Sequence, residues 1–228
     1  APTGTGKTLS AFLVFIDKML AQAREGTLKK ELQLIYVSPL KSLASDIREN
    51  LRRPLSGIME EERITKNLAI SSISSLNIAV RTGDTSQNER RSMIKTPLHI
   101  LITTPESLFL LLSSKSGKKM LSTAKAIIID ELHALINSKR GSHLMLSIAR
   151  LDKLCGQPLQ RIGLSATIQP LDKAAHYLSP DPVTIIAPKM HKKIRLEITS
   201  PRSDAFSMQK NHIWHELASK VYELCQNS

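Results

Sequence analysis

The amino-acid sequence predicts an α/β fold, in which helices cover both faces of a mostly parallel central sheet. Two observations predict this class. Short apolar runs, rich in aliphatic and β-branched residues, alternate along the chain with longer segments of helical periodicity, as in successive βα units. The runs contain few polar residues, as expected of parallel strands that are buried on both faces. The predicted strands are residues 32–37, 78–81, 99–104, 126–129, 161–167, 183–186 and 194–198.

The predicted helices lie between these strands. Pro39 closes the first run and Pro105 closes the run 99–104, because proline cannot donate a hydrogen bond to a strand ladder. Polar loops are expected over 71–75 and 113–119. The predicted helices are residues 9–16, 40–47, about 59–68, a basic helix through 89–95, 106–112, about 141–154, 171–178 and 211–225.

The composition is that of a globular protein with a polyanionic partner. Of the 228 residues, 41% are hydrophobic and 23% charged, and 32 Lys and Arg against 20 Asp and Glu give a net charge of +12. This excess favours nucleic acid over a membrane surface as the partner. No apolar run approaches the roughly 20 residues of a membrane span. Cys155 and Cys225 lack a C-x-x-C spacing, so we expect reduced thiols in a cytoplasmic protein, with neither a disulfide nor a zinc site.

The first eight residues predict a phosphate-binding loop that leads into a helix. Gly4 and Gly6 allow the backbone N–H groups to turn inward around a phosphate. Lys7 supplies a charge for the β- and γ-phosphates, and the Thr8 hydroxyl is a ligand for Mg²⁺. The pattern therefore predicts ATP and Mg²⁺ as cofactors. The predicted nucleotide-binding residues are Pro2, Thr3, Gly4, Thr5, Gly6, Lys7 and Thr8.

A second acidic motif complements this loop. Asp130 and Glu131 follow the apolar run 126–129 directly. At the carboxyl end of a strand, the first carboxylate can hold Mg²⁺ and the second can orient or deprotonate the attacking water. Ligands of open α/β sheets collect at this edge, so we expect the two motifs to meet there.

Five stretches resemble, in the same order, motifs I, Ia, Ib, II and III of superfamily 2 helicases. They are residues 1–8, 38–43, 103–108, 130–133 and 165–167. Residues 83–90, 139–144 and 161–168 are similar to the large helicase-related (Lhr) proteins, which are DExH-type helicases of bacteria and archaea. Position 1 is Ala where phosphate loops usually begin with Gly, and helicase loops of this kind often carry Ala there.

The resemblance, which spans residue 1 to about 201, implies a RecA-like P-loop domain and a role for each motif. Lys7, Asp130, Glu131 and His133 would form the catalytic set, with His133 linking the nucleotide site to the nucleic-acid groove. Ser165 and Thr167 would couple hydrolysis to movement between domains. The residues implied to contact nucleic acid are Pro39, Leu40, Lys41, Arg81, Gly83, Thr104, Pro105 and Glu106.

The resemblance also implies a larger motor. Residues 1–200 would be the first RecA-like domain without its initial strand, and 201–228 a linker and helix leading toward a second RecA-like domain. The implied activity is ATP-dependent 3′–5′ translocation and unwinding of DNA, on a single strand or a tailed duplex, in the bacterial or archaeal cytoplasm near the nucleoid. No arginine-finger segment is visible, so we expect this piece alone to bind ATP weakly, hydrolyse it poorly and separate no strands.

Other interpretations stay open. A P-loop kinase or small-molecule ATPase would share the loop, and a non-catalytic nucleic-acid-binding module would share the fold. Pro39 and Pro105 could merely end strands, and Lys139-Arg140 could be a solvated basic turn. Residues 189–195 favour a basic linker. Phosphate contacts alone do not decide between DNA, RNA and a hybrid.

Overall fold

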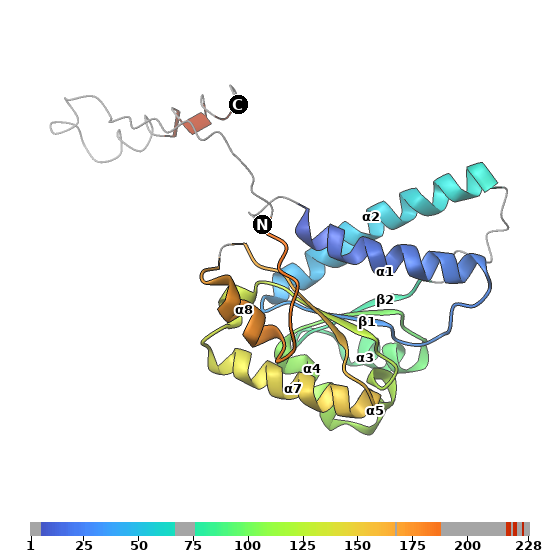
Figure 1. The fold of residues 1–228 in the computed structure, drawn as a ribbon. Coiled ribbons are helices and arrows are strands. Elements are labelled where there is room, and N and C mark those ends of the chain that lie inside the picture. Colours follow the sequence, from blue (N-terminus) through green and yellow to red (C-terminus); the bar gives the residue numbers. More distant parts are fainter. Residues whose placement is uncertain are drawn as a thin grey trace. The chain divides into compact units, whose positions relative to one another are not determined.

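Five short parallel strands form the centre of the fold (Figure 1). The computed structural model describes residues 6–66, 76–166 and 168–187, with 218, 219, 221, 222 and 225. The chain divides into units 1–190 and 191–228, and the sheet belongs to the first. Its strands lie in the order β2-β3-β1-β4-β5, and every neighbouring pair is parallel. The strands are β1 (Leu34–Val37), β2 (Ile78–Arg81), β3 (Ile100–Thr103), β4 (Ala126–Ile129) and β5 (Gln160–Gly163).

Eight helices of the described residues connect and flank these strands. α1 and α2 lie on one face of the sheet, and α4, α5 and α7 lie on the other (Figure 1). Their bounds are α1 (Lys7–Arg24), α2 (Lys41–Lys66), α3 (Gln87–Lys95), α4 (Pro105–Ser113), α5 (Lys115–Leu121), α6 (Leu132–Leu135), α7 (Lys139–Cys155) and α8 (Leu171–Leu178).

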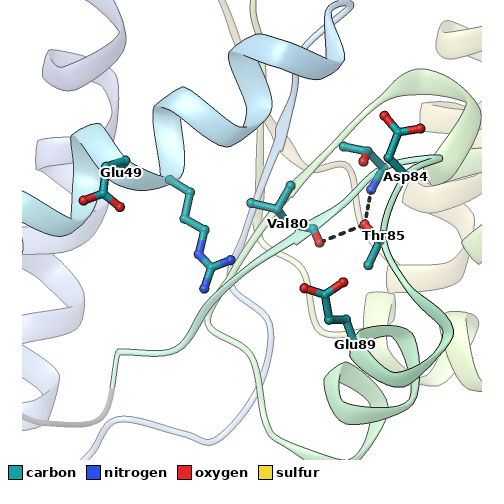
Figure 2. A pocket seen from close by; sticks show the side chains of 7 residues that line it. Glu49, Val80, Asp84, Thr85 and Glu89 are labelled. Atoms are coloured by element: carbon teal, nitrogen blue, oxygen red, sulfur yellow. Dashed lines mark hydrogen bonds between the residues drawn. The ribbon is translucent and has the colours of Figure 1, made fainter.

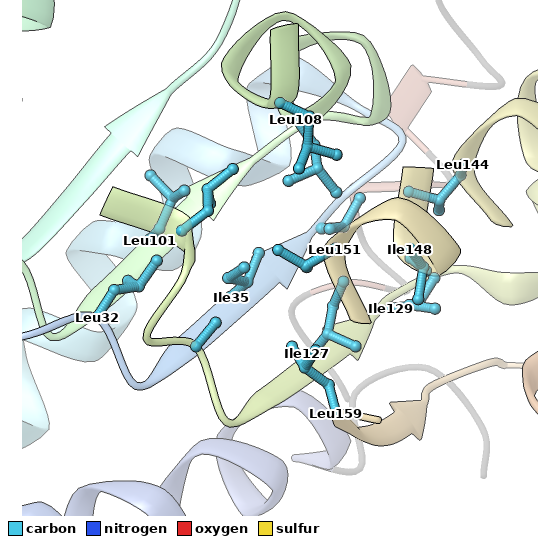
Figure 3. Close-up of a cluster of buried hydrophobic side chains, with 14 of the residues drawn as sticks. Leu32, Ile35, Leu101, Leu108, Ile127, Ile129, Leu144, Ile148, Leu151 and Leu159 are labelled. Carbon is cyan, nitrogen blue, oxygen red and sulfur yellow. The ribbon is translucent and has the colours of Figure 1, made fainter. Parts of the chain in front are cut away.

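The core has two layers because alternate residues of a strand point to opposite faces. In β1, Leu34 and Tyr36 join the cluster under α1 and α2, whereas Ile35 and Val37 join the cluster under α4 and α7. Figure 3 shows the second cluster, in which side chains from β1, β3 and β4 meet Leu108, Leu144, Ile148 and Leu151 from the helices. All four residues of β1, β3 and β4 are buried, which explains their continuous apolar runs.

The five strands end level with one another. Val37 pairs with Thr103 on one side and Ile129 on the other, and these in turn pair with Arg81 and Gly163. The loops that follow all five strands therefore start from one edge of the sheet. This edge brings together sequence motifs that lie far apart along the chain.

The structure corrects four expectations. Most of the loop expected over 113–119 belongs to α5 (Lys115–Leu121), because Ser114 caps this helix by accepting from the Gly117 N–H and Leu121 is buried. Residues 183–186 form no strand with the described sheet, and the Ile186 side chain is 84% exposed. β5 ends at Gly163, so the predicted strand 161–167 is too long. The helices expected over 40–47 and 59–68 are one helix, α2, which continues through Pro54.

Some of the predicted elements lie in parts of the chain that the structure does not describe. The predicted loop 71–75 and the predicted strand 194–198 lie outside the described residues, as does most of the predicted helix 211–225. Among the helices of the described part, none combines the length and apolar character that a membrane span requires.

Candidate nucleotide and nucleic-acid site

The phosphate loop enters helix α1 at its amino terminus. Gly6 adopts the left-handed conformation, with φ of 74°, which glycine tolerates without a steric penalty. Lys7 and Thr8 occupy the first turn of α1, and this turn carries no acidic residue. The unpaired N–H groups of such a turn favour an anion. Pro2, Thr3, Gly4 and Thr5 lie outside the described residues.

Asp130 lies beside this turn, although 122 residues separate it from Thr8. The Thr8 hydroxyl is 3.5 Å from Asp130 Oδ2, and the Asp130 side chain is buried. The Tyr36 hydroxyl donates to the same oxygen, and the Glu131 N–H donates to Oδ1 at 2.8 Å. The structure thus brings the phosphate loop and the acidic motif to one place at the sheet edge.

Tyr36 is a site residue that the sequence did not indicate. Its ring packs 5.1 Å from the ring of Phe12 in α1, and its hydroxyl reaches Asp130. Burial, with the negative charge of Asp130, raises the pKa of Tyr36 well above its usual range. The hydroxyl therefore stays protonated and donates to the carboxylate, which offsets part of the cost of burying that charge.

Glu131 is held in a strained backbone conformation. Its φ of 49° and ψ of 47° lie in the left-handed region, which residues with a side chain rarely occupy. Such strain costs about 1–3 kcal/mol and is concentrated at functional positions. Within the described residues Glu131 Oε2 is buried without a hydrogen-bond partner. A buried acceptor of this kind suits a water molecule that must be oriented or deprotonated.

His133 connects Glu131 to the segment that follows β5. Its Nδ1 lies 3.2 Å from Glu131 Oε2, close enough for an ion pair when the ring is protonated, but not aligned for a hydrogen bond. The same nitrogen is 3.2 Å from Ser165 Oγ. The Leu132 N–H also donates to Leu164 O at 3.0 Å, so the segment after β5 contacts the acidic motif at two points. Thr167 lies outside the described residues.

The donor set at this edge fits Mg²⁺ bound together with a nucleotide. The described residues contain no group of three or more His, Cys, Asp or Glu able to hold a metal ion by themselves. Mg²⁺ in nucleotide sites, however, takes only one or two protein ligands, and phosphates and waters provide the rest. Thr8 and Asp130 supply such a hydroxyl and carboxylate, 3.5 Å apart.

The loop after β1 is joined to the start of α4 by Arg140, the second residue of α7. The Arg140 guanidinium forms a two-pronged ion pair with Glu106, in which Nη2 is 2.9 Å from Oε2. Its Nη1 donates to the carbonyl of Pro39 at 2.6 Å. The pair lowers the pKa of Glu106 and raises that of Arg140. Arg140 is therefore no solvated turn, and it fixes the spacing of the two segments implied to contact nucleic acid.

The same loop is joined on its other side to the turn after β2. Lys41 Nζ lies 2.9 Å from Asp84 Oδ1. A Cβ at Gly83 would meet Lys41 Nζ at 3.2 Å, so glycine leaves room for the lysine side chain. The segments after β1 and β2 are thus linked by an ion pair, and Arg140 links the segments after β1 and β3 by a hydrogen bond and an ion pair.

The predicted nucleic-acid contacts separate into exposed and buried residues. Leu40, Lys41, Gly83 and Glu106 are exposed. Pro39, Arg81, Thr104 and Pro105 are buried. Thr104 uses its hydroxyl to cap α4, accepting from the Ser107 N–H, and Pro105, which has no N–H to leave unpaired, occupies the first turn.

A pocket of about 420 Å³ lies beside this edge, between α2, the turn after β2 and α3 (Figure 2). Thr85 shapes it, because its Oγ accepts from the Thr82 N–H at 2.9 Å and donates to Val80 O at 3.3 Å. Glu49, Asp84 and Glu89 line it together with Arg48. Three carboxylates to one guanidinium disfavour a phosphate inside this pocket, so it borders the predicted nucleic-acid path without forming part of it.

Comparisons with known proteins agree with this arrangement. The family model of the DEAD/DEAH box helicases matches residues 1–174. The Lhr helicase/probable uracil glycosylase of Mycolicibacterium smegmatis is 44% identical over 227 residues, which are 99% of this chain and 15% of that protein. The ATP-dependent helicase Lhr-Core of Methanothermobacter thermautotrophicus is 40% identical over 235 residues, which are 100% of this chain and 26% of that protein.

Solved structures show the same similarity. The structure of Mycobacterium smegmatis helicase Lhr bound to ssDNA and AMP-PNP superposes with a TM-score of 0.83 and 42% identity, over 100% of this chain and 28% of that one. The DUF1998 helicase MrfA bound to DNA and AMPPNP gives a TM-score of 0.63 and 26% identity, over 82% of this chain and 24% of that one. This chain therefore spans about a quarter or less of the length of most of these relatives.

Proposed function

Because this chain belongs to the DEAD/DEAH box helicase family, we propose that it is the ATP-binding domain of an Lhr-type nucleic-acid motor. The observation that carries the proposal is the meeting of Thr8, Asp130 and Glu131 at one edge of the sheet. Phosphate binding, metal binding and water activation need these three kinds of group within a few ångströms of one another.

Each residue of the site has a distinct task in ATP hydrolysis. Lys7 and the first turn of α1 would bind the β- and γ-phosphates. Thr8 and Asp130 would hold Mg²⁺, which neutralises charge on the phosphates when it is bound. Glu131 Oε2, which accepts no hydrogen bond from the described residues, would orient the attacking water and accept its proton. Pro2, Thr3, Gly4 and Thr5 would complete the phosphate cradle through their backbone.

His133 and Ser165 would transmit the state of the nucleotide. A change in the position of Glu131 alters its 3.2 Å approach to His133, which in turn contacts Ser165 beyond β5. With Thr167, this segment would couple hydrolysis to a second RecA-like domain of the same longer protein.

Single-stranded DNA is the proposed nucleic-acid partner, as in the structure of helicase Lhr from Mycobacterium smegmatis. The exposed Leu40, Lys41 and Gly83, at the edge where α4 also begins, would contact its backbone without reading sequence. The buried Pro39, Arg81, Thr104 and Pro105 would shape these segments, and Glu106 would act through Arg140. For the whole protein we propose 3′–5′ unwinding in the cytoplasm of a bacterium or archaeon.

Filter binding of labelled AMP-PNP, with and without single-stranded DNA, tests the proposal against its rivals. A motor domain binds both ligands, and each increases the affinity for the other, because coupling between sites is reciprocal. A small-molecule kinase would bind nucleotide with no effect of DNA, and a non-catalytic module would bind DNA with no effect of nucleotide. Either result would refute the motor assignment.

Two substitutions separate binding from chemistry. Replacing Lys7 with Ala should abolish nucleotide binding, because the phosphates lose their cation. Replacing Glu131 with Gln should preserve binding and stop turnover in the full-length protein, because the amide cannot accept the water proton. Wild-type nucleotide affinity in the Lys7→Ala variant would contradict the assignment of the loop.

A further inference from the structure

A second, smaller pocket lies on the side of the domain, between α3, α4 and α5. Its volume is about 180 Å³. Arg81 and Arg90 line it from β2 and α3, and Ser114 and Ser116 line it from the start of α5. The remaining walls are apolar and consist of Met93, Ile94, Leu110, Leu111 and Met120.

Two guanidinium groups share this pocket, and neither pairs with a carboxylate of the described residues. Arg81 is 8% exposed, and its Nη1 donates to Thr82 O at 2.6 Å. Arg90 Nη2 donates to Gly83 O at 2.9 Å, and Arg90 Nε is buried without a hydrogen-bond partner among those residues. Burial and the charge of Arg90 lower the pKa of Arg81. Carbonyl oxygens supply only partial negative charge, so the pair of cations remains uncompensated.

The size and walls of the pocket identify the kind of anion that it suits. Pockets for small molecules usually measure about 300–1,000 Å³, so a pocket of about 180 Å³ takes one side chain better than a whole cofactor. Ile94 and Leu110 are 53% and 55% exposed at the surface, and Met93 and Met120 can adapt to an apolar neighbour. A nucleic-acid backbone would gain nothing from these apolar groups.

Arg81 lines the pocket from the end of β2, but on the α4 side the pocket lies away from the nucleic-acid edge. Leu110, Leu111 and Ser114 lie at the carboxyl end of α4, whereas Thr104 lies at its amino end. At a rise of about 1.5 Å per residue, the two ends are roughly 10 Å apart. We propose that this pocket receives an aspartate or glutamate side chain, flanked by apolar residues, from a segment of a partner protein. The carboxylate would accept charge-assisted hydrogen bonds from both arginines.

NMR titration of the ¹⁵N-labelled chain tests the proposal with two peptides, acetyl-Ala-Leu-Glu-Leu-Ala-amide and the same peptide with Gln in place of Glu. The Glu peptide should shift the Arg90 Nε signal and bind at least fivefold more tightly than the Gln peptide. Arg90→Gln should remove this preference, while Arg91→Gln, the same charge change at an exposed neighbour, should keep it. Equal binding of the two peptides, no response at millimolar peptide, or an unchanged preference in Arg90→Gln would overturn the proposal.

Two further measurements keep the proposal falsifiable. Without any ligand, Arg90→Gln should have a higher midpoint of thermal unfolding than Arg91→Gln, because it removes the part-buried cation that repels the buried Arg81. An equal or lower midpoint would contradict the uncompensated pair. A 12-nucleotide single strand should not displace the Glu peptide from the wild-type chain. Competition between these two ligands would place this pocket on the nucleic-acid path instead.

Discussion

Removing the Arg140 side chain should both destabilise the domain and weaken nucleic-acid binding. Arg140 joins Pro39 to Glu106 through one carbonyl hydrogen bond and one two-pronged ion pair. Glu106 is 56% exposed, so the ion pair contributes about 0.5–1 kcal/mol. The charged, part-buried hydrogen bond to Pro39 adds about 1–1.5 kcal/mol. We therefore expect Arg140→Ala to lower the free energy of unfolding by about 2 kcal/mol.

Urea unfolding, followed by circular dichroism, measures this loss in a double-mutant cycle. Glu106→Gln should cost about 0.5–1 kcal/mol, and the coupling energy between the two positions should be of the same size, because the bond to Pro39 survives in that variant. Arg140→Lys should restore only part of the loss, since an ammonium cannot make both prongs. Lys139→Ala, a change at the exposed neighbour, is the matched control.

The functional effect should be selective. Arg140→Ala should weaken the binding of single-stranded DNA severalfold while the affinity for AMP-PNP stays unchanged, because the partners that Arg140 has in the described part of the chain are Glu106 and Pro39, which are not nucleotide residues. The same loss for both ligands would indicate general damage to the fold. A coupling energy of zero, or a loss no larger than that of Lys139→Ala, would refute the positioning role.

Three other predictions follow from buried polar groups. Tyr36→Phe should weaken Mg²⁺-dependent nucleotide binding severalfold, as measured by calorimetry, because Asp130 loses its hydroxyl donor; unchanged binding would show that the donor is dispensable. Burial lowers the pKa of His99, whose Nδ1 accepts from the Asn77 N–H, so the free energy of unfolding should be highest above pH 6.5 and fall below it. In urea titrations at pH 5 and 7.5, His99→Gln should reduce this pH dependence, and an equal pH dependence in both proteins would contradict the prediction. Glu131→Asn should abolish ATP hydrolysis but raise the free energy of unfolding by up to about 1 kcal/mol, because Asn tolerates the left-handed conformation. A fall in the free energy of unfolding would argue against strain at this residue.

The sequence predicted the elements whose pattern is local. The strands β1, β3 and β4 are buried on both faces, so their apolar runs identify them without knowledge of neighbours. Residues 183–186, for which a strand was also predicted, have a similar composition, but no described strand pairs with them. The helix α5 was missed because its stability rests on the cap at Ser114 and on packing of Leu121, and its exposed residues are as polar as those of a loop.

In the candidate site, too, the sequence predicted some residues and not others. Motifs with fixed spacing placed Thr8, Asp130 and Glu131 at one sheet edge, because parallel strands deliver their loops to the same side. The partners of Arg140 lie 101 and 34 residues away, and nothing in the sequence pairs them. Tyr36 is similarly hidden within an apolar strand, and only the three-dimensional register brings its hydroxyl to Asp130.

The central claim is that the phosphate loop and Asp130 form one nucleotide–metal site. Calorimetric titration of AMP-PNP with and without Mg²⁺ tests it most directly, in the wild-type chain, Asp130→Asn and the control Glu131→Gln. We predict that Mg²⁺ raises the affinity of the wild type and of Glu131→Gln at least tenfold, and that Asp130→Asn loses most of this gain. A full Mg²⁺ gain in Asp130→Asn would contradict the claim.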